Sequence, residues 1–165
     1  MRKIFAFTAS AFALSALTLS AEASPTYVDN FRLVDHERVS HELYYYQDGP
    51  AIVLMTVTAD SDFSVRAIEA LADLRDEYAA EGVRFYLINP DATETRTEMS
   101  DAMAAVGVDM PVLMDARQLV SESLALKTTG EVLVINPRTG FQLAYRGPVS
   151  GQVDGRGRTP YLANA

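Results

Sequence analysis

The 165-residue sequence contains no cysteine and no tryptophan, and its only histidines are His36 and His41. A serine hydroxyl does not ionise as a thiol does, and it cannot form a disulfide or a sulfenic acid. Thiol–disulfide exchange and other thiol-based redox reactions are therefore closed to this polypeptide. Its stability should also be the same with and without a strong reductant, because there is no disulfide to lose.

Acidic side chains outnumber basic ones by 22 to 14, which gives a formal net charge of −8. A surface with this balance is repelled by the phosphates of nucleic acids and by anionic lipids. We therefore expect no nucleic-acid partner and no anionic membrane surface as a binding site. The charge alone does not identify the partner.

The first 23 residues have the pattern of a cleavable signal peptide. A basic start, Arg2-Lys3, precedes an apolar run over residues 4–19 that is diluted with Ser and Thr, and Ala21-Glu22-Ala23 is an A-x-A cleavage site. The run is shorter and more polar than the roughly 20 apolar residues of a membrane span, so an uncleaved anchor is the weaker alternative. We predict cleavage after Ala23, export to the periplasm, and no stable membrane span afterwards.

The remaining chain is one domain with a short tail. Residues 24–149 are enough to bury a core without disulfides, since a domain near 150 residues buries roughly 68–70% of its unfolded surface. Residues 150–165 are rich in Gly, Arg and Pro, and no core element is visible in them.

The chain is organised around one stretch, in which a strand turns directly into a helix. An apolar, β-branched run over residues 52–57 predicts a buried strand. Ile68, Leu71 and Leu74 then recur at the spacing of one helix face, and Asp60 or Ser61 can cap the helix start. The free N–H groups at such a start favour a negative charge, so chemistry is often placed there.

The same rules predict further elements before and after this stretch. We expect strands over 31–35, 83–88, 111–114, 131–135 and 141–146, and helices over 41–46 capped by Ser40, from Thr95 or Thr97 to Gly107, and over 118–126. This order predicts an α/β fold with a mixed sheet, parallel in part and antiparallel at one edge, and with helices on both faces.

Four stretches, FRLVDHERVSHELYYY, GVRFYLINPDATETRTEM, PVLMDARQLVSESLAL and EVLVINPRTGFQLAYRGPV, resemble the redoxin branch of the thioredoxin superfamily. That branch includes alkyl-hydroperoxide-reductase/thiol-specific-antioxidant domains and exported thiol–disulfide oxidoreductases. The resemblance covers roughly residues 31–149. It implies a thioredoxin-like three-layer fold, a central mixed sheet between helices, with an extra N-terminal strand.

The resemblance also implies where the family's functional residues would lie, and this sequence departs from them. Ser61 falls at the position of the attacking cysteine, Ser64 at the second cysteine position, and Asp62 where proline is usual. Gly130 stands where thioredoxin-like proteins usually place a cis-proline packed against the thiols. We therefore expect no catalytic residue, and treat Ser61, Ser64 and Gly130 as degenerate site positions.

Other chemistries at this turn are weaker hypotheses. Ser61 as a nucleophile would need a general base, and nothing in the sequence places either histidine beside it. Asp60, Asp62, Asp91 and Glu94 could converge on a cation, but their spacing fits no calcium loop, so solvated loop acids are favoured. We expect no metal and no cofactor.

The favoured function is that of a redox-inactive binding or accessory domain. The groove of the former active site would be lined by 60–64 and 128–131, with Asp60, Asp62, Phe63, Thr128 and Thr129 as binding candidates. Thioredoxin folds bind extended segments there partly through backbone bonds, which need no thiol. The expected partner is a periplasmic protein or peptide segment. The alternatives are an antioxidant or oxidoreductase whose chemistry comes from a partner or cofactor, and a structural remnant without a partner.

Overall fold

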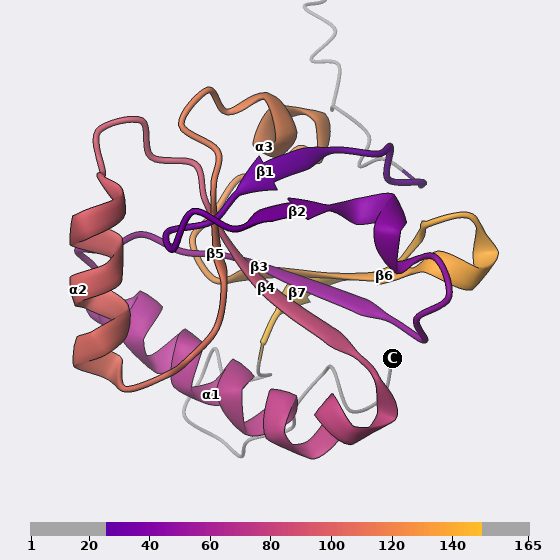
Figure 1. Cartoon of the computed structure of the whole chain (residues 1–165), viewed down its shortest axis with the longest axis horizontal. Helices are drawn as coiled ribbons and strands as arrows, with labels where there is room; N and C mark the ends of the chain where they lie inside the picture. Colours follow the sequence, from indigo (N-terminus) through magenta and orange to yellow (C-terminus); the bar gives the residue numbers. More distant parts are fainter. Residues whose placement is uncertain (1–25, 150–165) are drawn as a thin grey trace, which may run out of the picture.

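A five-stranded sheet runs through the computed structural model, which describes residues 26–149 (Figure 1). The spatial order is β5-β4-β3-β6-β7. The central strand β3 pairs in parallel with β4, as does β4 with β5, whereas β6 and β7 are antiparallel on the other side. These strands are β3 (Ile52–Thr56), β4 (Arg84–Asn89), β5 (Val112–Met114), β6 (Glu131–Asn136) and β7 (Gln142–Pro148). The predicted mixed sheet is confirmed.

Strand β3 lies at the centre because every one of its five residues is apolar or β-branched and buried. Strands covered on both faces read as continuous apolar runs rather than as alternating patterns. Val53 and Met55 point into one core cluster, and Ile52 and Leu54 into the cluster on the opposite face. The sheet therefore separates two apolar layers.

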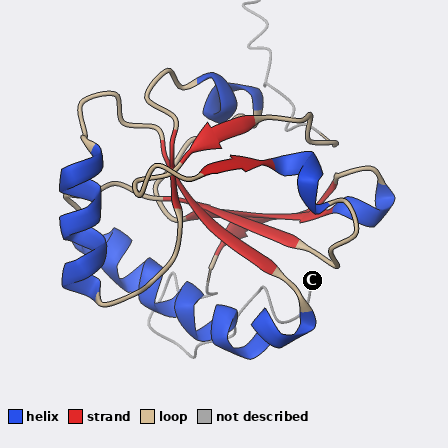
Figure 2. Ribbon diagram, viewed as in Figure 1, coloured by secondary structure: helices blue, strands red, loops and turns tan. Residues whose placement is uncertain are grey.

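Helices cover both faces and complete a three-layer architecture (Figure 2). The helices α1 (Asp62–Tyr78) and α2 (Arg96–Val106) bury their apolar sides, including Leu71 and Met99, in the cluster that contains Val53. The opposite cluster contains Leu43 of the short 3-10 helix η1 (Leu43–Tyr46) and Val120 of α3 (Leu119–Ser123). A small antiparallel sheet of β1 (Arg32–Val34) and β2 (Ser40–Glu42) packs on that same side.

Two predicted helices differ from the structure. The helix expected over 41–46 with a Ser40 cap is wrong in its first half, because Ser40 pairs with Val34 and only Leu43–Tyr46 is helical. The helix expected over 118–126 ends at Ser123. Ala125 then has a positive φ of 50°, and the Arg146 guanidinium binds the carbonyls of Leu124 and Ala125.

Helix α2 begins with the capping pattern that the sequence predicted as one of two options. The hydroxyl of Thr95 accepts a hydrogen bond from the N–H of Glu98 at 3.3 Å, and the Glu98 carboxylate accepts one from the N–H of Thr95 at 2.7 Å. This reciprocal arrangement satisfies two N–H groups that a helix start otherwise leaves without partners. Thr95, rather than Thr97, is therefore the cap.

We expect Thr95→Ala to lower the free energy of unfolding by about 1 kcal/mol at neutral pH. The N–H of Thr95, followed by its hydroxyl, holds the pKa of Glu98 below its usual value, and alanine removes only the hydroxyl's contribution. A depressed carboxyl pKa stabilises the fold above the unfolded pKa and loses that effect as pH falls through the folded pKa. The difference from wild type should therefore shrink in acid. Urea unfolding at neutral and at acidic pH measures this difference. Thr97→Ala is the matched control, and it should change the free energy of unfolding little.

Within residues 26–149, no helix is long and apolar enough to cross a membrane. The predicted signal peptide, residues 1–23, and the predicted tail, residues 150–165, lie outside the described part of the chain.

Candidate functional site

The turn between β3 and α1 holds Ser61, the first of the positions that the resemblance predicts to be degenerate. Ser61 is the N-cap of α1, and its Oγ accepts a hydrogen bond from the N–H of Ser64 at 3.3 Å. The predicted cap is confirmed, with Ser61 rather than Asp60 in that role. The hydroxyl of Ser61 thus satisfies a helix N–H group, which is a structural task.

Ser64, predicted to be the second such position, is almost fully buried in the first turn of α1, with 2% of its surface exposed. Its Oγ accepts a hydrogen bond from the N–H of Thr58 at 3.2 Å and lies 3.5 Å from the Thr58 hydroxyl. A buried hydroxyl with these partners holds the strand end against the helix start. It is not presented to a substrate.

Gly130 and Phe63 lie directly against each other. The N–H of Gly130 donates to the carbonyl of Thr56 at 2.7 Å, which ties the end of the 124–130 loop to β3. The backbone of Gly130 has a φ of +79°, and a Cβ added there would overlap Cε1 of the Phe63 ring and lie 3.0 Å from Cζ. The ring is still half-exposed. Phe63 therefore joins the start of α1 to the loop that precedes β6.

The segment that precedes β6 forms the other wall. Thr128 is exposed and Thr129 is half-buried. Among the described residues, the N–H groups of both threonines and the carbonyl of Thr129 have no hydrogen-bond partner. The loop itself is fixed, because the Glu131 carboxylate binds the N–H of Lys127 at 3.0 Å and the Arg146 guanidinium at 2.9 Å. Unpaired, fixed backbone groups at a surface are suited to pair with an extended segment.

Glu94 has a role that the sequence did not reveal. Its two carboxylate oxygens lie 2.9 and 2.8 Å from the N–H of Ala59, and one of them also accepts from the side chain of Asn89. Asn89 is completely buried at the end of β4. The carboxylate thus joins the loop before α2 to the loop before α1. The interpretation of Glu94 as a solvated loop acid is wrong.

The other three acidic residues that were considered as cation ligands lie near the surface. Asp91 binds the N–H and hydroxyl of Thr93, and these bonds hold the pKa of Asp91 below its usual value. Asp60 and Asp62 are exposed. Within residues 26–149 there is no group of three or more His, Asp or Glu side chains arranged to hold a metal ion.

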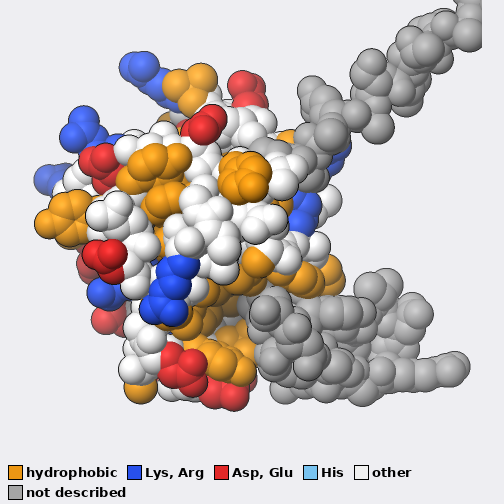
Figure 3. Space-filling view, turned by 90° about the vertical axis from the view of Figure 1, so that its right-hand side faces the viewer, with side chains coloured by type: hydrophobic (Ala, Val, Ile, Leu, Met, Phe, Trp, Pro, Cys, Tyr) orange, Lys and Arg blue, Asp and Glu red, His pale blue; other side chains and the backbone are white. Residues whose placement is uncertain are grey.

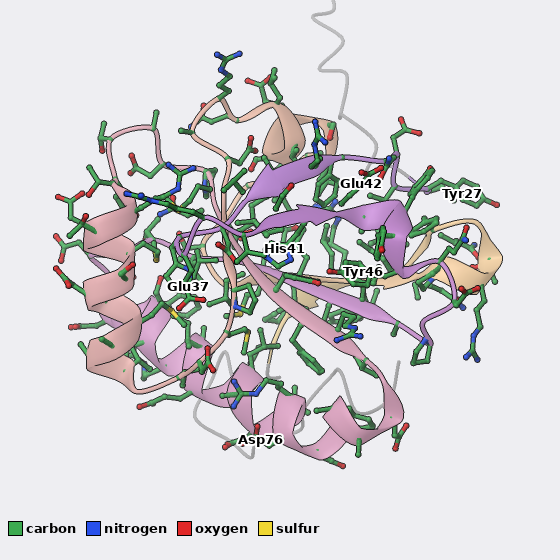
Figure 4. All side chains as sticks on the ribbon, viewed as in Figure 1. Tyr27, Glu37, His41, Glu42, Tyr46 and Asp76 are labelled. Atoms are coloured by element: carbon green, nitrogen blue, oxygen red, sulfur yellow. The ribbon has the colours of Figure 1, made fainter. Side chains whose placement is uncertain are left out.

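Neither histidine hydrogen-bonds to Ser61. The side chain of His41 points from β2 toward the central sheet (Figure 4), where its Nε2 lies 2.7 Å from a carboxylate oxygen of buried Asp35. Its ring meets Tyr86 edge-on, on the sheet face opposite α1. Nδ1 of His36 accepts from the N–H of Val112. Among the described residues, therefore, neither histidine is placed to act as a general base for Ser61.

Tyr86, His41 and Asp35 form a buried polar group on the sheet face opposite α1. Burial, followed by a hydrogen bond with Tyr46, strongly raises the pKa of Tyr86, so its phenol stays neutral. The Asp35 carboxylate also accepts from the N–H groups of Glu37 and Val39. The group therefore anchors the β1–β2 turn to the main sheet.

The sheet order, the two covering layers and the strand-to-helix turn with its opposing loop define a thioredoxin-like α/β protein. Residues 26–146 match the AhpC/TSA family. The chain therefore belongs to the AhpC/TSA family, as its resemblance to redoxins predicted, although the family member described here lacks cysteine.

Solved structures agree with this assignment. A hypothetical protein from Sinorhizobium meliloti 1021 is 26% identical, with a TM-score of 0.73 over 87% of this chain and 80% of that one. An uncharacterized conserved protein from Geobacillus kaustophilus is 19% identical, with a TM-score of 0.71 over 85% and 77%. The peroxidoxin BcpB from Mycobacterium tuberculosis is 17% identical, with a TM-score of 0.64 over 76% and 84%. The last two show the fold alone. No curated protein matches the chain.

Proposed function

We propose that this protein is a redox-inactive redoxin of the periplasm that binds an extended segment of a partner protein. The observation that carries the proposal is the state of the two former cysteine positions. Ser61 and Ser64 are engaged in holding the start of α1, while the backbone of Thr129 beside them is unpaired. The site has kept a binding surface and has no thiol chemistry.

The chemistry of the groove suggests what the segment would contain. Phe63 is half-exposed and rests on Gly130, so an apolar side chain of the partner can pack against its outer face. Asp60 and Asp62 are exposed beside it and favour lysine or arginine nearby. The unpaired groups of Thr128 and Thr129 can form backbone bonds that do not depend on sequence.

The rival function is peroxide or disulfide reduction with chemistry supplied by a partner or a cofactor, which family membership favours. Purified mature protein should neither consume peroxide nor reduce insulin disulfides in the presence of a reductant. Turnover by the protein alone would contradict the proposal.

Phe63→Asp is expected to weaken binding of the partner by tenfold or more, because it removes the aromatic contact and adds a negative charge beside Asp60 and Asp62. Loss of a buried aromatic anchor commonly changes binding by about 2 kcal/mol or more. The measurement is capture from a periplasmic extract, followed by titration of the captured partner's segment. Tyr45→Asp is the matched control, since Tyr45 is 85% exposed on η1, away from the groove. Equal loss in both variants, or none in either, would contradict a groove at Phe63.

A further inference from the structure

A hollow of about 190 Å³ lies in the sheet face that carries α1, beneath the C-terminal half of that helix. Strands β3, β4, β6 and β7 and helix α1 all contribute to its wall, through Val53, Phe85, Val134, Ala144, Leu74 and Tyr78. Apart from Asn136 and the Tyr78 hydroxyl, the lining is apolar. The neighbouring Ala51 precedes β3, whereas the groove lies where β3 ends, so hollow and groove are at opposite ends of this strand.

This part of the face has little cover among the described residues. Helices α1 and α2 lie over the same core cluster, but Ala144 on β7 is exposed. Figure 3 shows hydrophobic side chains reaching the surface on the side of the molecule that carries the β6–β7 turn. Filling an apolar hollow of this size with an apolar group removes apolar surface from water, which stabilises the protein.

The chain leaves β7 on the sheet face that contains the hollow, although at the other end of the strand, where Pro148 pairs with Glu131. Val149, the last described residue, is 5% exposed and belongs to the same core cluster as Val53 and Leu74. The chain thus continues from the face in which the hollow lies. Residues 150–165 contain one pair of large apolar side chains, Tyr161-Leu162, among mainly small and polar residues.

The distances allow this pair to reach. Ala144 lines the hollow and precedes Val149 by five residues of extended chain, which span about 17 Å. Tyr161 follows Val149 by twelve residues, which span about 18 Å when helical and about 40 Å when extended. The helical span matches the distance back to Ala144 and the extended span exceeds it, so the segment is long enough to bring the pair to the level of Ala144.

Charge favours the same occupant. Glu77 and Glu81 lie beside Tyr78 at the rim, and their negative charges help to raise the pKa of its phenol. Residues 150–165 bring Arg156 and Arg158 shortly before the apolar pair, against a single acid, Asp154. Basic residues next to the inserted pair would meet acidic residues at the rim.

We infer that the segment 156–162 of this chain binds the hollow, with Tyr161 and Leu162 inserted beneath α1 and Arg156 and Arg158 beside Glu77 and Glu81. The site is an intramolecular one. It closes the uncovered part of the sheet face and leaves the groove at the other end of β3 accessible. The inference is independent of what the groove binds.

The absence of native cysteine allows a direct test by cross-linking. The full chain carrying Ala144→Cys and Leu162→Cys is incubated with oxidised glutathione, which accepts the two electrons as the two thiols join. We expect an intramolecular disulfide, seen as a faster-migrating monomer on a non-reducing gel. The matched control pairs Leu162→Cys with Tyr45→Cys, an exposed position on η1 over the opposite core cluster.

The Ala144 pair should close at least tenfold faster than the Tyr45 pair. Both variants must keep the melting temperature of wild type under reductant, so that the rates refer to the native fold. Arg156→Glu with Arg158→Glu should slow closure of the Ala144 pair, and added salt should slow it in the parent background. Equal closure rates for the two pairs would overturn the inference. Disulfide-linked dimers forming faster than the intramolecular product would also overturn it, and would assign the hollow to a second copy of the chain.

Discussion

Gly130→Ala is expected to lower the free energy of unfolding by about 2–5 kcal/mol, from two separable causes. The backbone φ of +79° lies in the left-handed region, which costs roughly 1–2 kcal/mol for a residue that carries a Cβ. The Cβ would also overlap the ring of Phe63, and forcing such an overlap in a packed site costs about 1–3 kcal/mol. Chemical denaturation of wild type and variant measures the sum.

Two further variants separate these causes. Gly140 has a φ of +78° but nothing within 4 Å of an added Cβ, so Gly140→Ala should show the backbone effect alone. Adding Phe63→Ala to Gly130→Ala should remove the overlap, so that the remaining loss approaches that of Gly140→Ala once the effect of Phe63→Ala alone is subtracted. If Gly130→Ala and Gly140→Ala have the same effect without this second change, Phe63 does not press on Gly130.

Proline at position 130, where the resemblance to redoxins predicts a cis-proline, should be tolerated less well than alanine. Proline fixes φ near −65°, far from +79°, and it has no N–H to donate to the carbonyl of Thr56. A Cβ at position 130 would also overlap the ring of Phe63, so proline meets the same obstacle as alanine there.

The elements that sequence reasoning predicted well are those determined by neighbouring residues. Strand β3 follows from a continuous apolar run, and α1 from its periodic apolar face and the Ser61 cap, whose partner is three residues away. Local pattern and global fold agree in this stretch, which is why the fold class could be predicted.

The features that were missed depend on residues far apart in the chain. Ser40–Glu42 is a strand because it pairs with β1 and because His41 binds Asp35, and neither partner is visible in a six-residue window. Nothing in the sequence near Glu94 distinguishes it from a solvent-exposed loop acid. Asn89, however, is a polar residue at the end of a buried strand, and its side chain needs a hydrogen-bond partner. The contact of Phe63 with Gly130 joins two segments that only the sheet order brings together.

The double change Ser61→Cys, Ser64→Cys is expected to give this protein, which has no cysteine of its own, an intramolecular disulfide between the two positions. The two positions lie three apart in the first turn of α1, and side chains at that spacing share one helix face. The hydroxyl at position 61 already accepts the N–H of residue 64, so a sulfur there would receive the same donor. The oxidised variant should contain no free thiol, and it should accelerate reduction of insulin disulfides by dithiothreitol, which wild type should not do.

The two thiols should differ in pKa. A helix start favours the thiolate at position 61, whose pKa should fall below the ordinary value of about 8.5. At position 64 the thiol would be buried, which favours its neutral form. Titration of thiolate absorbance in each single variant measures the two values separately.

Asp62 should limit the fall at position 61, because its carboxylate is exposed on the first helical residue and opposes a neighbouring negative charge. In the Ser61→Cys background, Asp62→Asn should therefore lower the thiol pKa by removing the charge alone. Asp62→Pro should lower it as well without breaking the helix, since the first helical position needs no N–H partner. Two thiols that stay free after oxidation, with equal and ordinary pKa values, would show that Ser61 and Ser64 do not occupy the redoxin cysteine positions, and the groove proposed beside them would then lose its basis.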